Sequence, residues 1–153
     1  MDNERARRII TSNRKARHNY DILETFETGI VLTGTEVKSL RNGNANVQNS
    51  YAIIKNGELW LLDMHISPFS HGGIYNHDPL RERKLLVHKK QLRKLFAKTQ
   101  EKGLTLIPLL VYFDGSFVKI ELGVARGKRS FDKRESITKR EANRELQKRF
   151  RRS

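Results

Sequence analysis

Two turn signals, each set between strand-like segments, constrain the fold of this chain most strongly. Asn56 and Gly57 separate SYAIIK from ELWLLDMHI, and Asp114 and Gly115 separate TLIPLLVYF from SFVKIELGVA. Pairs of this kind favour the two-residue type I′ turn, in which both central residues have a positive φ. The sequence therefore predicts two antiparallel hairpins.

Helical patterns interrupt the strand-like segments. HKKQLRKLFAKTQEKG places Leu92, Leu95 and Phe96 at helical spacing, which predicts an amphipathic helix with a basic outer face. TEVKSLRNG predicts one or two further helical turns, with Thr35 as the N-cap and Gly43 as the stop.

A third strand-like segment, YDILETFETGIVLTG, precedes the shorter helix. Few strands, turn signals and inserted helices together favour a small closed antiparallel barrel. We therefore expect a mainly β fold with added helices: an OB-type closed antiparallel β-barrel of about six strands and two or three helices, followed by a basic C-terminal tail.

The charge is unevenly spread along the chain. Lys and Arg number 31 against 17 Asp and Glu, a net charge of +14 that favours a polyanionic partner. Residues 126–153 hold 12 basic and 4 acidic residues and so carry +8 of that charge. We predict a mobile basic arm over residues 1–12, the barrel domain over 13–125, and a tail over 126–153 that is disordered alone and helical against a negatively charged partner.

Several classes of protein do not fit this composition. The chain has no cysteine, which excludes disulfides and thiolate chemistry and suits a reducing cytosol. The longest apolar run, LTLIPLLVYF, is half the roughly 20 residues that a spanning helix needs, and the N-terminus has no secretory pattern. His71, His77 and Asp78 match no metal-binding spacing, and neither a phosphate loop nor a nuclease-like acidic cluster is present. We expect a cytoplasmic protein that does not associate with a membrane. We also expect that it binds no metal or cofactor and that it is not an enzyme.

Basic residues beside aromatic rings favour an RNA partner. NRKARHNY places Arg14, Lys15 and Arg17 beside the rings of His18 and Tyr20, a combination typical of contacts to single-stranded or looped RNA. The alternative is a solvated charge run that leads into a strand.

The shorter helix offers a second candidate surface. Lys38 and Arg41 share one of its faces, where an RNA contact and ordinary solvation are equally supported. The cations of the longer helix fit a solvated face better.

Five segments resemble, in order and spacing, the SsrA-binding protein (SmpB) family, the bacterial partner of tmRNA. They are NRKARHNY, GTEVKSLR, ANVQNSYAIIKNGELWLLDMHISP, DPLRERKLLVHKKQL and KIELGVARGKRSFDKR. GTEVKSLR together with GVARGKRSFDKR is the most specific part of the likeness. The resemblance implies an OB-type barrel that is not an enzyme. It also implies binding to the tRNA-like domain of tmRNA, and delivery of that RNA to stalled ribosomes for trans-translation.

The resemblance also implies site residues. The family's tmRNA contacts fall on Glu27, Leu86 and Lys119, although the residues alone would assign Leu86 to the core. With the basic groups above, the expected tmRNA-binding residues are Glu27, Leu86, Lys119, Arg14, Arg17, His18, Lys38 and Arg41.

For the tail, the resemblance implies contact with the rRNA of the decoding region and with the vacant mRNA channel. Phe131 stands where relatives have an aromatic residue or His, which suits stacking on a ribosomal base, and Phe150 differs from the residues of relatives. The expected ribosome-contacting residues are Lys128, Arg129, Phe131, Asp132, Lys133, Arg134 and Phe150.

Two other functions compete with this interpretation. A structural ribosomal protein that binds rRNA would have the same basic composition and barrel. An RNA-processing enzyme is disfavoured because the acidic residues form no cluster that could hold Mg²⁺. We expect a monomer whose partners are tmRNA and the ribosome.

Overall fold

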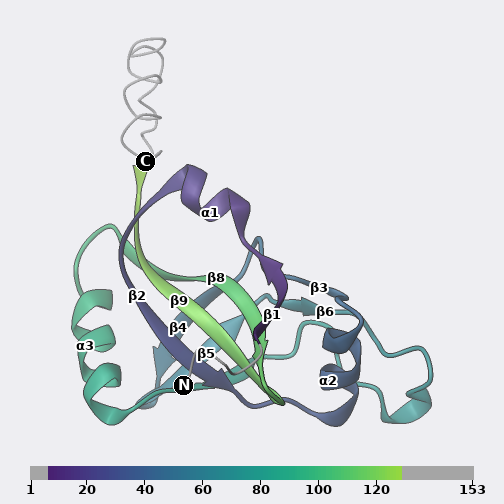
Figure 1. Ribbon diagram of the computed structural model, residues 1–153. Coiled ribbons are helices and arrows are strands. Elements are labelled where there is room, and N and C mark those ends of the chain that lie inside the picture. The colour runs from purple at the N-terminus through teal and green to yellow at the C-terminus, as the bar shows by residue number, and fades with distance from the viewer. Residues whose placement is uncertain (1–6, 129–153) are drawn as a thin grey trace, which may run out of the picture.

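Figure 1 shows the computed structural model of the chain, which describes residues 7–128. The part described is mostly β-strand, with three α-helices and a short 3-10 helix. In chain order the elements are β1 (Arg7–Ser12), α1 (Arg14–Asn19), β2 (Tyr20–Ile30), α2 (Gly34–Arg41), β3 (Ala45–Asn46), β4 (Tyr51–Lys55), β5 (Glu58–Leu62), β6 (His65–Ile66), η2 (Gly73–Tyr75), β7 (Arg83–Leu86), α3 (Lys89–Thr99), β8 (Leu104–Asp114) and β9 (Phe117–Gly127).

Six strands close into a ring of antiparallel pairings. β8 pairs with β4, β4 with β5, β5 with β7, β7 with β2, β2 with β9, and β9 again with β8. Closure of this kind gives each strand in the ring two neighbours and removes most of the exposed edge of an open sheet. β4 pairs with β8 only at Ala52 and Leu106, so the second half of β8 keeps one edge unpaired by the ring. The predicted fold class, mainly β with helices around a closed antiparallel arrangement of about six strands, is confirmed.

The interior of the ring forms the main hydrophobic core. Leu40 of α2 and Leu95 of α3 are fully buried and pack against the side chains that the strands direct inward. Phe96 was expected in the same apolar stripe as Leu95, but it is 50% exposed. One residue along a helix turns the side chain by about 100°, so α3 buries Leu95 and leaves Phe96 outside.

Both predicted hairpins are present, but only one has the expected turn. Asn56 and Gly57 have φ values of 55° and 74°, as a type I′ turn requires. In the second hairpin the strand pairing continues through Asp114, so the two-residue loop is Gly115 and Ser116. Of these two only Gly115 has a positive φ, 65°, which is typical of a type II′ turn with glycine first. The type I′ prediction for this turn is wrong.

The ordered structure extends past both predicted ends of the barrel domain. Arg7–Ser12 form β1, which pairs with the second half of β8 and directs Ile10 onto the core. The prediction of a mobile arm is therefore wrong for residues 7–12, because an open edge of β8 is available to pair with them. At the other end β9 continues to Gly127, which lies opposite Tyr20, so residues 126 and 127 belong to the sheet and not to the tail.

The basic run at residues 14–19 forms the helix α1, which leads directly into β2 at Tyr20. Asn13 is its buried N-cap: its side-chain oxygen accepts from the Ala16 amide at 3.2 Å, and its side-chain nitrogen donates to the carbonyls of Val47 and Pro108 at 3.2 and 3.0 Å. Ala16 packs onto a second, smaller apolar cluster with Ile107 outside the ring. These contacts fix α1 on the outer surface of the strands (Figure 1).

Candidate nucleic-acid interface

Three of the predicted RNA-binding residues meet at one surface hollow. Glu27 comes from β2, Leu86 from the end of β7 and Lys119 from β9, and all three line a hollow of about 450 Å³. The other lining residues are Gly29, Ile30, Val87, His88, Gln91, Phe117 and Val118.

Gly29 is the position that brings the three residues together. It lies opposite Leu86 in the pairing of β2 with β7, and opposite Lys119 in the pairing of β2 with β9. Glu27 precedes it by two residues and therefore faces the same side of β2. A Cβ at Gly29 would stand 3.5 Å from the Cβ of Leu86, so the missing side chain leaves room for the hollow.

Leu86 lies on the outer surface and not in the core. Along β7 the side chains of Arg83 and Leu85 are buried and alternate with those of Lys84 and Leu86, as the two faces of a strand require. Leu86 is 48% exposed. The core assignment that the residues alone suggested is wrong, and the position is open to contact by a partner.

The carboxylate of Glu27 is held by two neighbours that the sequence analysis did not single out. The hydroxyl of Tyr112 donates to its Oε2, and Nη2 of Arg7 lies 3.6 Å from the same oxygen. The Arg7 guanidinium also lies 4.8 Å from the centre of the Tyr112 ring. Burial, and then the hydrogen bond to Glu27, raise the pKa of Tyr112, so its hydroxyl remains a donor.

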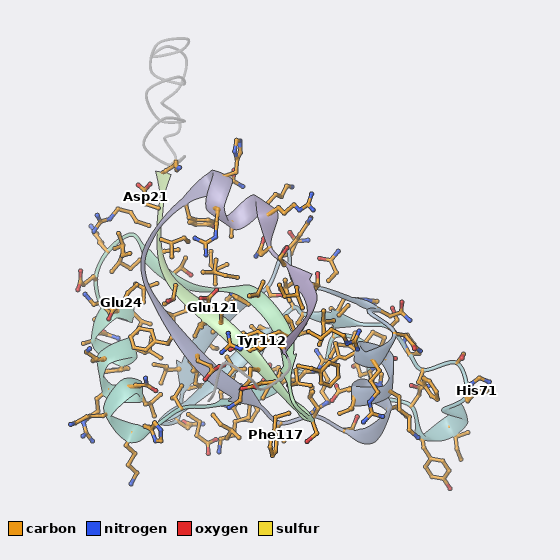
Figure 2. The ribbon with its side chains drawn as sticks, in the orientation of Figure 1. Asp21, Glu24, His71, Tyr112, Phe117 and Glu121 are labelled. Atoms are coloured by element: carbon orange, nitrogen blue, oxygen red, sulfur yellow. The ribbon has the colours of Figure 1, made fainter. Side chains whose placement is uncertain are left out.

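Glu27 therefore offers its second oxygen to a partner. Within residues 7–128, Oε1 of Glu27 takes part in no hydrogen bond or ion pair, and the side chain is 46% exposed. Glu121, which Figure 2 labels, lies directly opposite Glu27 in the pairing of β2 with β9 and adds negative charge beside the hollow. Such a site attracts hydrogen-bond donors, for example the amino group of a base, whereas Lys119 on the other side suits a phosphate.

Arg7 and Tyr112 could not be found from spacing in the sequence. They are 105 positions apart and approach each other only because β1 pairs with β8, which brings Ile9 opposite Tyr112. The sequence analysis placed Arg7 in a mobile arm, and a mobile segment has no defined contacts from which a neighbour could be predicted.

The remaining predicted residues form two further groups. Arg14, Arg17 and His18 are exposed on α1, at the opposite end of β2 from the hollow (Figure 1). β2 separates the two sites by up to about 30 Å, at roughly 3.3 Å per strand residue. The structure therefore presents the predicted residues on separate surfaces and not as one patch.

α2 carries the third group. Lys38 and Arg41 are both exposed, and the Nζ of Lys38 lies 5.6 Å from the ring centre of Phe69. The carbonyl oxygen of Arg41 accepts a hydrogen bond from Nη2 of Arg8 at 3.0 Å. Both cations face outward, so each is available to a phosphate.

One predicted tail residue lies within the structure described. Nζ of Lys128 is 3.8 Å from Oδ1 of Asp21 across exposed surface, a pair of the kind that adds little stability. Figure 2 places Asp21 beside the end of β9. The other predicted tail residues lie outside residues 7–128: Arg129, Phe131, Asp132, Lys133, Arg134 and Phe150.

A buried ionic cluster joins α2 to the start of β7. Glu36 and Arg83 are completely buried, with Nε of Arg83 2.6 Å from Oε2 of Glu36. Arg81 adds a two-pronged contact, with Nη2 at 2.7 Å from Oε1 and Nε at 3.1 Å from Oε2. Arg83 also donates to the carbonyl of Met64 at 2.7 Å. The cluster connects two of the quoted sequence segments, GTEVKSLR and DPLRERKLL.

The same cluster keeps Glu36 ionised. Burial on its own would raise the pKa of Glu36, but hydrogen bonds from Arg81, from the amide of Thr33 and from Arg83 lower it to about 2. The Thr33 amide donates to Oε1 at 2.8 Å, which makes Thr33 and not Thr35 the N-cap of α2. A buried, ionised carboxylate with hydrogen bonds to both of its oxygens has a structural role.

His77 has structural partners as well. Its Nδ1 lies 2.9 Å from the hydroxyl of Thr35 and its Nε2 lies 2.9 Å from the carbonyl oxygen of Ile66. Within the part of the chain that the structure describes, no three His, Asp or Glu residues form a group that could hold a metal ion. No helix among residues 7–128 is long and apolar enough to cross a membrane.

Comparison with known proteins gives matches along almost the whole chain. The family model described as SmpB protein matches residues 10–152. An SsrA-binding protein of Carboxydothermus hydrogenoformans is 58% identical over 144 residues, 94% of this chain and 97% of that protein. An SsrA-binding protein of Desulforudis audaxviator is also 58% identical, over 139 residues and 91% of each chain.

A solved structure has the same fold. It is described as "tmRNA-SmpB: a journey to the center of the bacterial ribosome", and it matches with a TM-score of 0.66 and 52% sequence identity. The match covers 77% of this chain and 83% of the other. With the family model and the relatives, this likeness shows that the chain belongs to the SmpB family of SsrA-binding proteins.

Proposed function

We propose that this protein binds the tRNA-like domain of tmRNA and delivers it to stalled ribosomes for trans-translation. The observation that carries the proposal is the match of the SmpB family model to residues 10–152. Relatives named SsrA-binding protein, and a solved structure described by tmRNA, SmpB and the bacterial ribosome, support the two partners. The net charge of +14 supports a polyanionic partner independently.

The hollow at Glu27, Leu86 and Lys119 is the proposed contact with the tRNA-like domain. Three residues that were chosen from a family resemblance line one exposed hollow, although they come from three different strands. Their chemistry covers what an RNA contact needs: an acceptor for a base edge, an apolar surface and a cation for a phosphate. The exposed cations of α1 and α2 are proposed to contact further phosphates.

The tail over residues 128–153 is the proposed contact with the ribosome, in the decoding region and the empty mRNA channel. Its charge supports an rRNA partner. We propose a cytoplasmic monomer that acts by binding and not by catalysis, because the family resemblance implies an RNA escort.

Affinity capture followed by RNA sequencing tests the proposal. The full-length tagged protein, recovered from cells, is expected to enrich tmRNA strongly over rRNA relative to input RNA. Recovery of rRNA without enrichment of tmRNA would contradict the proposal and support a structural ribosomal protein instead.

Removal of the tail tests whether the two RNA contacts are separate. Truncation after Gly127 keeps β9 and the whole ring intact, because β9 ends at that residue. The truncated protein is expected to fold and bind tmRNA with unchanged affinity but to support no tagging of incomplete proteins. Binding is measured by gel shift with the tRNA-like domain, and tagging by detection of the tag on a stalled reporter. Loss of tmRNA binding would show that the contacts are not separable.

A further inference from the structure

Phe117 is a large aromatic side chain that the core does not use. It is 66% exposed at the start of β9 and lines the same hollow as Glu27 and Lys119. Figure 2 shows it at the turn end of the β8–β9 hairpin, directed away from the ring of strands. Nothing in the spacing of the sequence distinguished it from the inward-facing aromatic residues.

The strand geometry places Phe117 beside the proposed contact residues. Phe117, Lys119 and Glu121 occupy every second position along β9, so their side chains face the same side of the sheet. Glu121 is in turn opposite Glu27 on β2. The hollow therefore combines an exposed aromatic ring, a half-exposed leucine, a cation and a carboxylate whose Oε1 has no partner among residues 7–128.

A single unpaired nucleotide has the chemistry that matches these groups. Its base is flat and stacks on aromatic rings, its Watson–Crick edge carries donors once it leaves a helix, and its phosphate is negative. A paired base could not use the same site, because its edge and both faces are occupied in the duplex. The carboxylates at one side of the hollow also argue against a site that takes phosphates alone.

We propose that the hollow holds one unpaired nucleotide of the bound RNA, with its base stacked on Phe117, its donor edge at Oε1 of Glu27 and its phosphate at Lys119. This inference rests on the proposed function, because it names the part of the RNA that the hollow receives. Arg7 and Tyr112 act as positioning residues, since they hold the other oxygen of Glu27.

The experiment measures binding of the purified tRNA-like domain of tmRNA to the full-length protein and its variants over a range of salt concentrations. Phe117→Ala is expected to bind about tenfold more weakly, the usual size of one lost base–aromatic stack, without a change in the slope of log affinity against log salt. Phe117→Trp retains a ring and is expected to bind as well as the wild type.

Phe96→Ala is the matched control. Phe96 is similarly exposed but lies on α3 and does not line the hollow, so its removal is expected to leave affinity unchanged. Thermal unfolding of each variant confirms that the fold is kept, as exposed side chains allow.

Fluorescence gives a direct test of stacking. In a Trp60→Phe background, the tryptophan of the Phe117→Trp variant becomes the one indole of the chain, and its emission is expected to be quenched when the RNA binds. Unchanged affinity of Phe117→Ala, equal losses in Phe117→Ala and Phe96→Ala, or unquenched emission would overturn the inference while the proposed function stands. A wild-type protein that fails to bind the RNA would overturn the proposed function itself.

Discussion

Two glutamates of this protein are each paired with arginine, and their surroundings give them different roles. Glu36 is completely buried, and its two oxygens accept from Arg81, Arg83 and a backbone amide. Glu27 is about half exposed and lines the hollow, and one of its oxygens contacts Tyr112 and Arg7.

The difference shows how to separate a structural carboxylate from a binding one. A buried carboxylate whose oxygens all accept hydrogen bonds has no acceptor left for a partner. Its ion pair is needed for stability, because an unpaired buried charge destabilises the fold. A half-exposed carboxylate that is held at one oxygen keeps a fixed position and a free acceptor.

The largest effect is expected when the buried cluster is broken. Glu36→Gln leaves the buried guanidinium of Arg83 without a counter-charge, which typically costs about 3–5 kcal/mol in the free energy of unfolding. Glu27→Gln is the matched control and is expected to cost less than about 1 kcal/mol, because the pair with Arg7 is exposed. Urea denaturation of both variants measures the difference. Equal losses of stability would remove the distinction between the two glutamates.

The pH dependence of stability sharpens the same comparison. The pKa of Glu36 is lowered to about 2 in the folded protein, from 4.5 without its surroundings. Its contribution to stability is therefore present above pH 4.5 and is lost as the pH falls from about 4.5 to about 2, on the order of 3 kcal/mol in all. Denaturation at several pH values should show the wild type losing stability more steeply than Glu36→Gln across this window. Parallel curves for the two proteins would contradict the assignment.

RNA binding should reverse the order of the two glutamates. Glu27→Gln is expected to weaken binding of the tRNA-like domain about tenfold, since a hydrogen bond to a charged acceptor contributes roughly 1.5–3 kcal/mol. If Glu27 only repelled phosphates, removal of its charge would tighten binding instead. Filter binding at fixed salt concentration therefore decides between an acceptor and a repulsive group.

The smallest effect is expected at the cation of the hollow. Lys119→Ala should weaken binding a fewfold and lower the slope of log affinity against log salt by about one, the contribution of one released counterion. Lys90→Ala serves as the control, because Lys90 is a cation of α3 that does not line the hollow. An unchanged slope in Lys119→Ala would exclude Lys119 from phosphate contact.

Much of the fold follows from local pattern. Asn56 and Gly57 need positive φ values and therefore specify the first hairpin, and the stripe that includes Leu95 specifies α3. β1 could not be predicted in this way. Arg7–Ser12 become ordered only because a neighbouring strand offers an unpaired edge, and such a partner is not visible in the sequence of the segment itself.

The candidate site was predictable only in part. Glu27, Leu86 and Lys119 came from a family resemblance, while composition favoured the cations of α1 and α2, which lie elsewhere. Leu86 shows why residue type fails here: the alternation along β7 decides which leucine is buried, and a four-residue strand is too short for its pattern to be recognised. Arg7, Tyr112 and Phe117 depend on strand register, which no local pattern specifies.

β9 has a consequence for how the two proposed partners work together. Its eleven residues run from Phe117 at the hollow to Gly127, and it pairs with β2 and β8 over almost its whole length. At roughly 3.3 Å per residue, this strand sets a span of about 30 Å between the RNA at one end and the start of the C-terminal segment at the other. If both proposed contacts are made, the length of this strand, and not the reach of a flexible linker, sets the distance between them. Little conformational entropy remains to be lost in this part of the protein when both partners are engaged.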